Sequence, residues 1–309
     1  MEHQARGLEI HHHVREKIPC LDGSVTTLDS SPEILRDEVP VLLVPGWSET
    51  IGTYEAGLEK MNEMGRRSIG IEFPRRGVFG VGEKGTEIDN EADRKAEAVY
   101  SVIKAKDDID KFDIVAHSEG AVNALIAASF VPERVRNIVL VNPAGLIGQD
   151  TFLRLSTSFS KAIGQDMIRS IQSLRSTQRR GEFIRNFGNT TLETAKYVSQ
   201  NPLRALSEVR YLVKSDTSDL VKQLTDTGIN IGILANWDDP VFPEPRMREM
   251  LEGQDIAQFH TIAGGHNALN TTPRVHITEA VEMLERMRVR DEIGKERVDI
   301  VGDKLLLRE

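Results

Sequence analysis

Residues 113–121 read Asp-Ile-Val-Ala-His-Ser-Glu-Gly-Ala, and this segment is the most informative part of the sequence. The apolar run predicts a buried strand over 112–116, and the small residues after it predict a helix. Ser118 then lies on the sharp turn between strand and helix, where only small residues fit on either side. Ala116 and Gly120 occupy those positions. Ser118 is therefore a candidate nucleophile, although a serine that merely caps a helix gives a similar pattern.

Strands and helices alternate on both sides of this turn. The central strands are continuous apolar runs, which is typical of parallel strands that are buried on both faces. Helical periodicity fills the intervals between them, so the sequence predicts an α/β fold with a mostly parallel central sheet flanked by helices. A hairpin with strands at 8–14 and 25–28 precedes it. The sheet strands are expected at 39–44, 68–73, 112–116, 135–141, 229–234 and 258–262.

Residues 146–224 interrupt the alternation. They contain no buried strand pattern, and helical periodicity dominates, with Asn201-Pro202 typical of a helix start. We therefore predict a core formed by residues 1–145 and 225–309, and a helical cap formed by residues 146–224. The cap is basic, because residues 151–214 hold 11 Lys+Arg against 4 Asp+Glu. That charge has two interpretations, docking of the cap onto an acidic body or attraction of anionic substrates or lipid.

Composition narrows the class of protein. The chain has 309 residues, 39% hydrophobic and 28% charged, as expected for a soluble globular protein. No apolar run approaches the roughly 18–20 residues that span a bilayer, and the first residues lack the pattern of a secretory signal. A single cysteine, Cys20, suits a reducing compartment, and the net charge of −9 disfavours a nucleic-acid partner. We expect a cytoplasmic protein and leave its oligomeric state open.

Two later segments add the other side chains that an activated serine needs. Asp239 follows the strand expected at 229–234, and His266 follows the strand expected at 258–262. The carboxyl ends of parallel strands meet at one edge of a sheet, so both residues are expected near Ser118. A serine hydroxyl needs a histidine base, and a carboxylate fixes the tautomer of that histidine. Asp238 is the rival carboxylate.

These residues resemble the catalytic motifs of the α/β-hydrolases, and the resemblance covers about residues 39–288. In that family the nucleophile, acid and histidine follow one another in this order. The resemblance implies Ser118 as nucleophile, His266 as base, and Asp239 as acid, because Asp239 matches the family pattern Asp-x-x-x-Pro. It also implies an oxyanion hole formed by the backbone N–H groups of Trp47 and Glu119. Two departures are Pro45 in place of the usual histidine and an extra residue in the loop at 76–80.

The resulting prediction is a serine hydrolase that acts on a carboxylic ester or related small acyl substrate through an acyl-enzyme. A C–C bond hydrolase with the same triad and a non-catalytic ligand-binding protein are the alternatives. No cofactor or metal is expected. We considered a metal site at His11-His12-His13 and a nucleotide loop among the glycines of 77–85, and we favour neither. Because the three candidate residues lie outside 146–224, we expect the chemistry not to depend directly on cap side chains.

Overall fold

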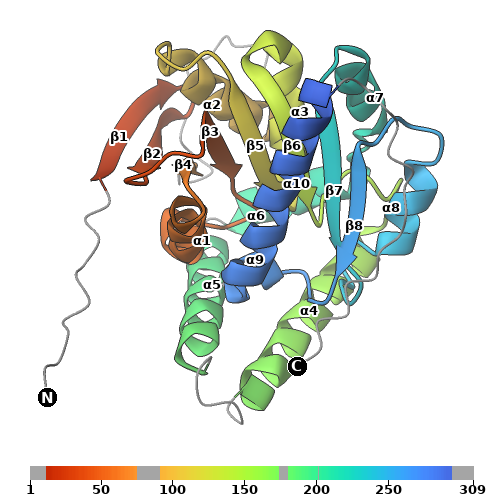
Figure 1. The fold of residues 1–309 in the computed structure, drawn as a ribbon. Coiled ribbons are helices and arrows are strands. Elements are labelled where there is room, and N and C mark those ends of the chain that lie inside the picture. Colours follow the sequence, from red (N-terminus) through yellow and green to blue (C-terminus); the bar gives the residue numbers. More distant parts are fainter. Residues whose placement is uncertain (1–11, 75–90, 174–179, 201, 294–309) are drawn as a thin grey trace, which may run out of the picture.

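The computed structural model describes residues 12–74, 91–173, 180–200 and 202–293, and within these residues eight strands form one sheet (Figure 1). The strand order is β1-β2-β4-β3-β5-β6-β7-β8. Neighbours from β4 to β8 are parallel, whereas β2 is antiparallel to both β1 and β4. The strands are β1 (His12–Cys20), β2 (Gly23–Ser31), β3 (Asp37–Val44), β4 (Arg66–Glu72), β5 (Phe112–His117), β6 (Val135–Val141), β7 (Asn230–Asn236) and β8 (Gln258–Ile262). The predicted fold class is confirmed.

Helices cover both faces of the sheet, and alternate strand residues face the two layers. In β3, Leu42 and Val44 pack in the cluster that contains α2 and α3, whereas Val41 and Leu43 pack in the cluster that contains α1 and α10. Both faces are therefore apolar, as the uninterrupted apolar runs require. The helices are α1 (Ile51–Glu63), α2 (Glu91–Ala105), α3 (Glu119–Phe130), α4 (Phe152–Ser173), α5 (Arg180–Gln200), α6 (Pro202–Lys214), α7 (Ser218–Asp226), α8 (Glu244–Met250), α9 (Ala268–Thr271) and α10 (Pro273–Ile293).

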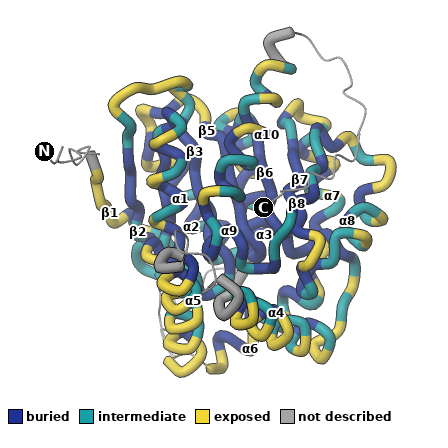
Figure 2. Tube along the Cα trace, turned by 60° about the horizontal axis from the view of Figure 1, so that its bottom comes forward, coloured by how far each residue is buried: buried dark blue, intermediate teal, exposed yellow. Residues whose placement is uncertain are grey.

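The segment between β6 and β7 is helical, as predicted. Helices α4 and α5 lie beyond the carboxyl ends of the strands (Figure 1), and α6 contacts both. All three expose much of their surface (Figure 2). In contrast, α7 packs against α3, and its Val221 and Leu224 are buried in the same cluster as the sheet. Among the described helices, none combines the length and the apolar character needed to cross a membrane.

The N-terminal hairpin differs from its prediction. Its turn lies at Leu21-Asp22, because Cys20 pairs with Gly23, but both strands are longer than expected, at His12–Cys20 and Gly23–Ser31. The first strand continues past residue 14 without a sequence signal, because β1 is an edge strand whose residues are mostly polar and show no apolar alternation. Residues 8–11 and the glycine-rich loop at 76–85 lie outside the described residues.

Candidate active site

Ser118 stands between the end of β5 and the start of α3, on a strained turn. Its φ is 52° and its ψ is −120°, a backbone conformation that residues other than glycine rarely adopt. The helix leaves this turn directly beside the end of β3. A Cβ atom on Gly120 would lie 2.5 Å from the carbonyl oxygens of both Val44 and Pro45. The local sequence therefore places a serine on a sharp corner of the backbone and requires glycine two residues later.

Replacing Gly120 by alanine is expected to lower the free energy of unfolding by about 1–3 kcal/mol, because the added methyl group meets backbone that cannot move aside. Urea denaturation of the purified variant measures this loss. Gly164→Ala is the matched control, since its added Cβ on α4 would have no neighbour within 4 Å, and we expect unchanged or slightly higher stability. Equal stability of the two variants would contradict the packing described here.

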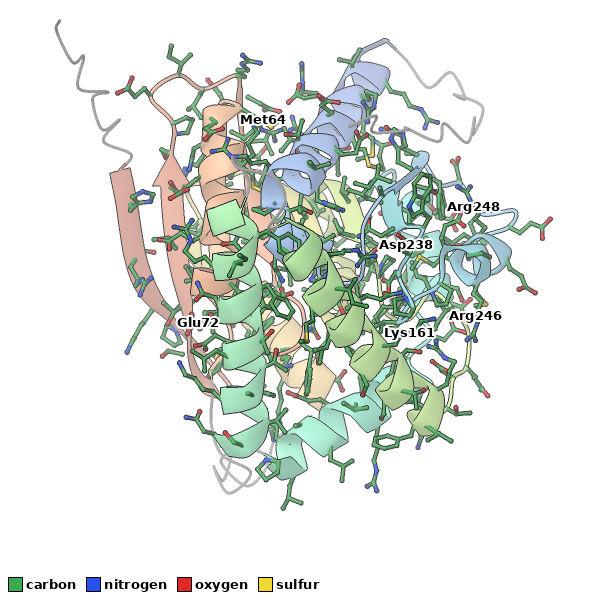
Figure 3. All side chains as sticks on the ribbon, turned by 90° about the horizontal axis from the view of Figure 1, so that it is seen from below. Met64, Glu72, Lys161, Asp238, Arg246 and Arg248 are labelled. Atoms are coloured by element: carbon green, nitrogen blue, oxygen red, sulfur yellow. The ribbon has the colours of Figure 1, made fainter. Side chains whose placement is uncertain are left out.

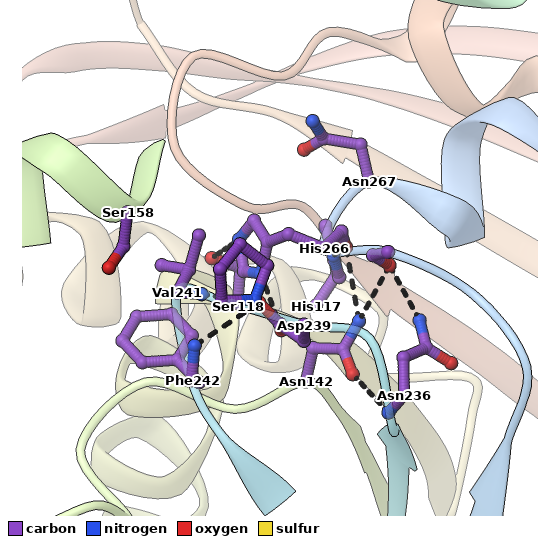
Figure 4. Close-up of polar contacts among 12 residues, drawn as sticks. His117, Ser118, Asn142, Ser158, Asn236, Asp239, Val241, Phe242, His266 and Asn267 are labelled. Atoms are coloured by element: carbon purple, nitrogen blue, oxygen red, sulfur yellow. Dashed lines mark hydrogen bonds and ion pairs between the residues drawn. The ribbon is translucent and has the colours of Figure 1, made fainter. Parts of the chain in front are cut away.

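The three predicted residues form one chain of hydrogen bonds (Figure 4). Ser118 Oγ lies 3.0 Å from His266 Nε2, and His266 Nδ1 lies 2.8 Å from Asp239 Oδ2. The other oxygen of Asp239 accepts the backbone N–H groups of Val241 and Phe242, at 2.7 and 3.2 Å. All three side chains are buried. Because each donor has one acceptor in line, this arrangement can carry a proton from the serine to the histidine.

Asp238 does not take part in this chain. Its side chain is 59% exposed and pairs with Arg169 of α4 at 3.3 Å. Figure 3 shows it on the same side of the molecule as Arg246 and Arg248 of α8. The structure thus brings Asp239, and not Asp238, to His266.

A second histidine–carboxylate pair, His117 and Glu49, lies beside the first. No pattern in the sequence indicated that these two residues meet. His117 Nδ1 lies 2.7 Å from Glu49 Oε1, while His117 Nε2 lies 3.0 Å from the carbonyl oxygen of His266. The other Glu49 oxygen accepts the N–H of Gly46 at 2.6 Å. Burial alone would lower the pKa of His117, but the Glu49 carboxylate raises it, and the imidazolium in turn lowers the pKa of Glu49. This pair joins the turn after β3 to the loop of His266.

Two asparagines and a third histidine fix the loop of His266 from behind. Asn142 Nδ2 donates to the carbonyl oxygen of His266 at 3.0 Å, and Asn236 Nδ2 donates to that of Gly265 at 2.7 Å. His276 Nε2 lies 3.0 Å from Asn236 Oδ1. These contacts leave the imidazole of His266 little freedom to turn away from Ser118. No local motif marks them, because each joins residues from different strands and helices.

The buried His276 predicts a loss of stability in mild acid. Burial lowers its pKa from 6.5 to about 4. As the pH falls through 6.5, the unfolded chain therefore binds a proton that the folded chain does not, and stability is lost progressively down to about pH 4. Urea midpoints measured across this range should fall for the wild type and fall less steeply for His276→Gln. Parallel pH profiles for the two proteins would contradict the assignment.

The two predicted oxyanion donors lie on adjacent segments. Trp47 occupies a tight turn closed by a hydrogen bond from the N–H of Glu49 to the carbonyl oxygen of Gly46, so its own N–H is not used by that turn. Glu119 is the first residue of α3, and the N–H of a first helical residue has no acceptor within its helix. Gly120 packs on the end of β3, which brings these segments together.

A cavity of about 420 Å³ opens above Ser118 and His266, between the sheet and helices α4 and α5. Its wall is mainly apolar, with several hydroxyl groups. None of the described residues that line it is Lys or Arg, and Glu49, already paired with His117, supplies the one carboxylate among them. The apolar wall includes Trp47, Phe159, Ile163, Phe187, Ala195 and Val198, and the hydroxyl groups come from Ser48, Thr190, Thr191, Thr194, Ser199 and Thr271.

Within its described residues, the structure adds no candidate site for a metal ion. In the described ranges, no group of three or more His, Cys, Asp or Glu side chains is arranged to hold a metal ion. His11 lies outside those ranges. Independence from metals and cofactors stays a prediction.

Several solved structures with the same fold match this chain over almost their whole length. The esterase EaEST from Exiguobacterium antarcticum is 16% identical, with a TM-score of 0.63, covering 88% of this chain and 100% of its own. A thermophilic esterase from Thermogutta terrifontis is 16% identical, with a TM-score of 0.60, covering 89% and 99%. A bromoperoxidase from Bacillus anthracis is 14% identical, with a TM-score of 0.62, covering 88% and 100%.

At such low sequence identities the similarity shows the fold alone. The names of these proteins also refer to different activities, esterase and bromoperoxidase. A comparison of the sequence with curated proteins finds no match. The family model of the alpha/beta hydrolase fold, however, matches residues 39–273, which is most of the chain and includes Ser118, Asp239 and His266. The chain is therefore a member of the α/β-hydrolase fold family.

Proposed function

We propose that this protein is a serine hydrolase that cleaves neutral carboxylic esters through an acyl-enzyme. The observation that carries the proposal is the unbroken hydrogen-bond chain from Ser118 through His266 to Asp239 at the base of an apolar cavity. The esterases among the solved structures with this fold are consistent with it. A carboxylate that orients the histidine and a histidine that faces the serine hydroxyl are what a nucleophilic serine requires.

In the proposed reaction, Ser118 Oγ attacks the ester carbonyl carbon while its proton moves to His266 Nε2. The carbonyl oxygen becomes an oxyanion and accepts the backbone N–H groups of Trp47 and Glu119. Asp239 holds the Nδ1–H of the imidazolium. When the intermediate collapses, the bond to the alkoxy oxygen breaks and His266 returns the proton to that oxygen, releasing an alcohol. Water then attacks the acyl-enzyme with the same proton transfers and releases the acid.

The contacts of the basic cap favour docking over steering. Arg154 of α4 pairs with Asp150 and donates to the carbonyl oxygens of Pro240 and Val241, at 3.2 and 2.8 Å. Arg169 of α4 pairs with Asp238, which follows β7 in the core, at 3.3 Å. Such cations are already neutralised by protein groups, so they offer little attraction to an anionic substrate. We therefore propose a neutral substrate, and we propose residues 146–224 as the cap that shapes its site, with α7 packed on the core.

A panel of chromogenic esters tests this proposal. It pairs neutral acyl chains of increasing length with esters whose acyl chain ends in a carboxylate, each assayed with the wild type and Ser118→Ala. We expect turnover of short and medium neutral esters, weak turnover of the anionic ones, little effect of salt, and full activity in EDTA. Absence of ester turnover would favour the C–C bond hydrolase if Ser118 still reacts with a fluorophosphonate, and the non-catalytic alternative if it does not. Activity lost in EDTA and restored by a divalent ion would contradict the serine mechanism.

A further inference from the structure

Glu208 of α6 is a buried carboxylate that lies outside the proposed catalytic chain. Its side chain is fully buried, although α6 belongs to the segment between β6 and β7 and exposes other residues to solvent. A buried carboxylate requires several donors, and among the described residues Glu208 has four: Trp47, Tyr197, Lys95 and Arg204. They come from four different parts of the chain. Trp47 itself carries one of the proposed oxyanion donors, and Lys95 pairs with Glu119, which carries the other.

The first connection is direct. The indole Nε1–H of Trp47 donates to Glu208 Oε2 at 2.7 Å. The same ring packs edge-on against the ring of Tyr197, with centroids 5.7 Å apart. The Tyr197 hydroxyl also donates a hydrogen bond to Glu208. Because Trp47 sits on a short turn, a fixed indole also limits rotation of its peptide unit. The side chain of Trp47 is thus held by a carboxylate 161 residues away in sequence.

The second connection runs through one lysine. Lys95 Nζ of α2 lies 2.9 Å from Glu208 Oε1 and 2.6 Å from Glu119 Oε2, with all three side chains buried. Burial and the Glu208 charge raise the pKa of Glu119 to about 7. Burial acts on Glu208 too, but Lys95, Tyr197 and Arg204 outweigh it and lower its pKa. Near neutral pH, Glu208 is therefore the carboxylate that stays ionised and holds Lys95 in place.

We propose that Glu208 is a positioning residue that holds Trp47 directly, and Glu119 through Lys95, in the orientation that the oxyanion hole needs. The inference rests on the proposed function, because an oxyanion must form for these donors to matter. It departs from the expectation that the chemistry is independent of cap side chains. Glu208 touches no reacting atom. Its effect is to keep two backbone N–H groups aimed at one point, where preorganised donors stabilise the transition state.

A purely structural role for Glu208 makes different predictions. An ion cluster that only holds the helices together would, when weakened, lower the unfolding temperature and the fraction of competent enzyme. Each remaining competent molecule would turn over at the normal rate. A misaligned oxyanion hole instead lowers kcat per competent active site and leaves KM nearly unchanged, since the donors act mainly in the transition state. Competent sites are counted by exhaustive fluorophosphonate labelling and mass spectrometry.

The experiment compares Glu208→Gln, Trp47→Phe and the double variant, with Glu193→Gln as a matched control. Glu193 belongs to the neighbouring helix α5 and pairs with Lys196 at the surface. We expect Glu208→Gln to lower kcat per labelled site by about 10–100-fold, less than the full loss of one donor, with KM within about threefold. Labelling by the phosphonate should slow by a similar factor. The double variant should lose less than the product of the single losses, because both changes act on the same hydrogen bond between Trp47 and residue 208. Glu193→Gln should match the wild type.

Wild-type kcat per labelled site in Glu208→Gln would overturn the inference, even if its unfolding temperature falls. If that variant does not fold, Trp47→Phe decides, because it removes the Nε1–H and keeps the backbone N–H. An unchanged kcat in Trp47→Phe would then overturn the inference, and a loss of about tenfold would support it. Failure of the proposed function is seen separately, as ester turnover that survives in Ser118→Ala.

Discussion

Replacing Ser118 by alanine is expected to lower kcat for a neutral ester by about 10⁵–10⁶-fold, because no other group on the turn can form the acyl-enzyme. Residual rate should come from binding and the oxyanion hole alone. The fold should persist, since alanine meets the same backbone conformation as serine. Initial rates of purified variants, compared with their unfolding temperatures, measure the effect.

Ser160→Ala is the matched control for that change. Ser160 is an exposed residue of α4 whose hydroxyl bonds only to the backbone oxygen of Ser156 among the described contacts. We expect its kcat to equal that of the wild type. Ester turnover in Ser118→Ala at more than about one percent of the wild-type rate would contradict the assignment of the nucleophile.

Replacing Asp239 by asparagine is expected to lower kcat by about 10⁴-fold while leaving the fold intact. An asparagine amide facing Nδ1 donates a hydrogen bond where the carboxylate accepted one, which favours the wrong tautomer of His266. The nitrogen facing Ser118 then carries a proton and cannot act as base. The loss should appear in kcat for every ester that the wild type cleaves.

Asp238→Asn is the control for this second prediction. Its exposed side chain pairs only with Arg169 among the described ion pairs, so we expect kcat within about threefold of the wild type. Comparison of the two variants at the same pH and ionic strength separates the two neighbouring carboxylates. A larger loss in Asp238→Asn than in Asp239→Asn would mean that the end of β7 is misassigned.

The sheet and the three candidate residues could be predicted because their signals are local. A strand buried on both faces, such as β3 or β6, is a continuous apolar run whatever surrounds it. Ser118 is marked by the small residues on both sides of its turn. Asp239 and His266 follow strands directly, so their common edge of the sheet follows from the parallel order alone.

The residues that surround Ser118, Asp239 and His266 have no local signal of this kind in the sequence. Glu49 and His117 are 68 positions apart, and Trp47 and Glu208 are 161 positions apart. Their contacts depend on how distant helices and loops pack, which residue type and spacing do not encode. The full length of the polar edge strand β1 could not be predicted for a related reason, because a strand with one partner and a solvated face needs no apolar alternation.

The site at which a fluorophosphonate attaches tests the role of Ser118 as nucleophile most directly. The probe reacts with an activated serine hydroxyl and forms a stable adduct that resembles the tetrahedral intermediate. We predict one adduct per chain, on the peptide that contains Ser118, formed rapidly in the wild type and much more slowly in Asp239→Asn. An adduct on another residue, or a Ser118 that stays unmodified in folded protein, would mean that Ser118 is not an activated nucleophile.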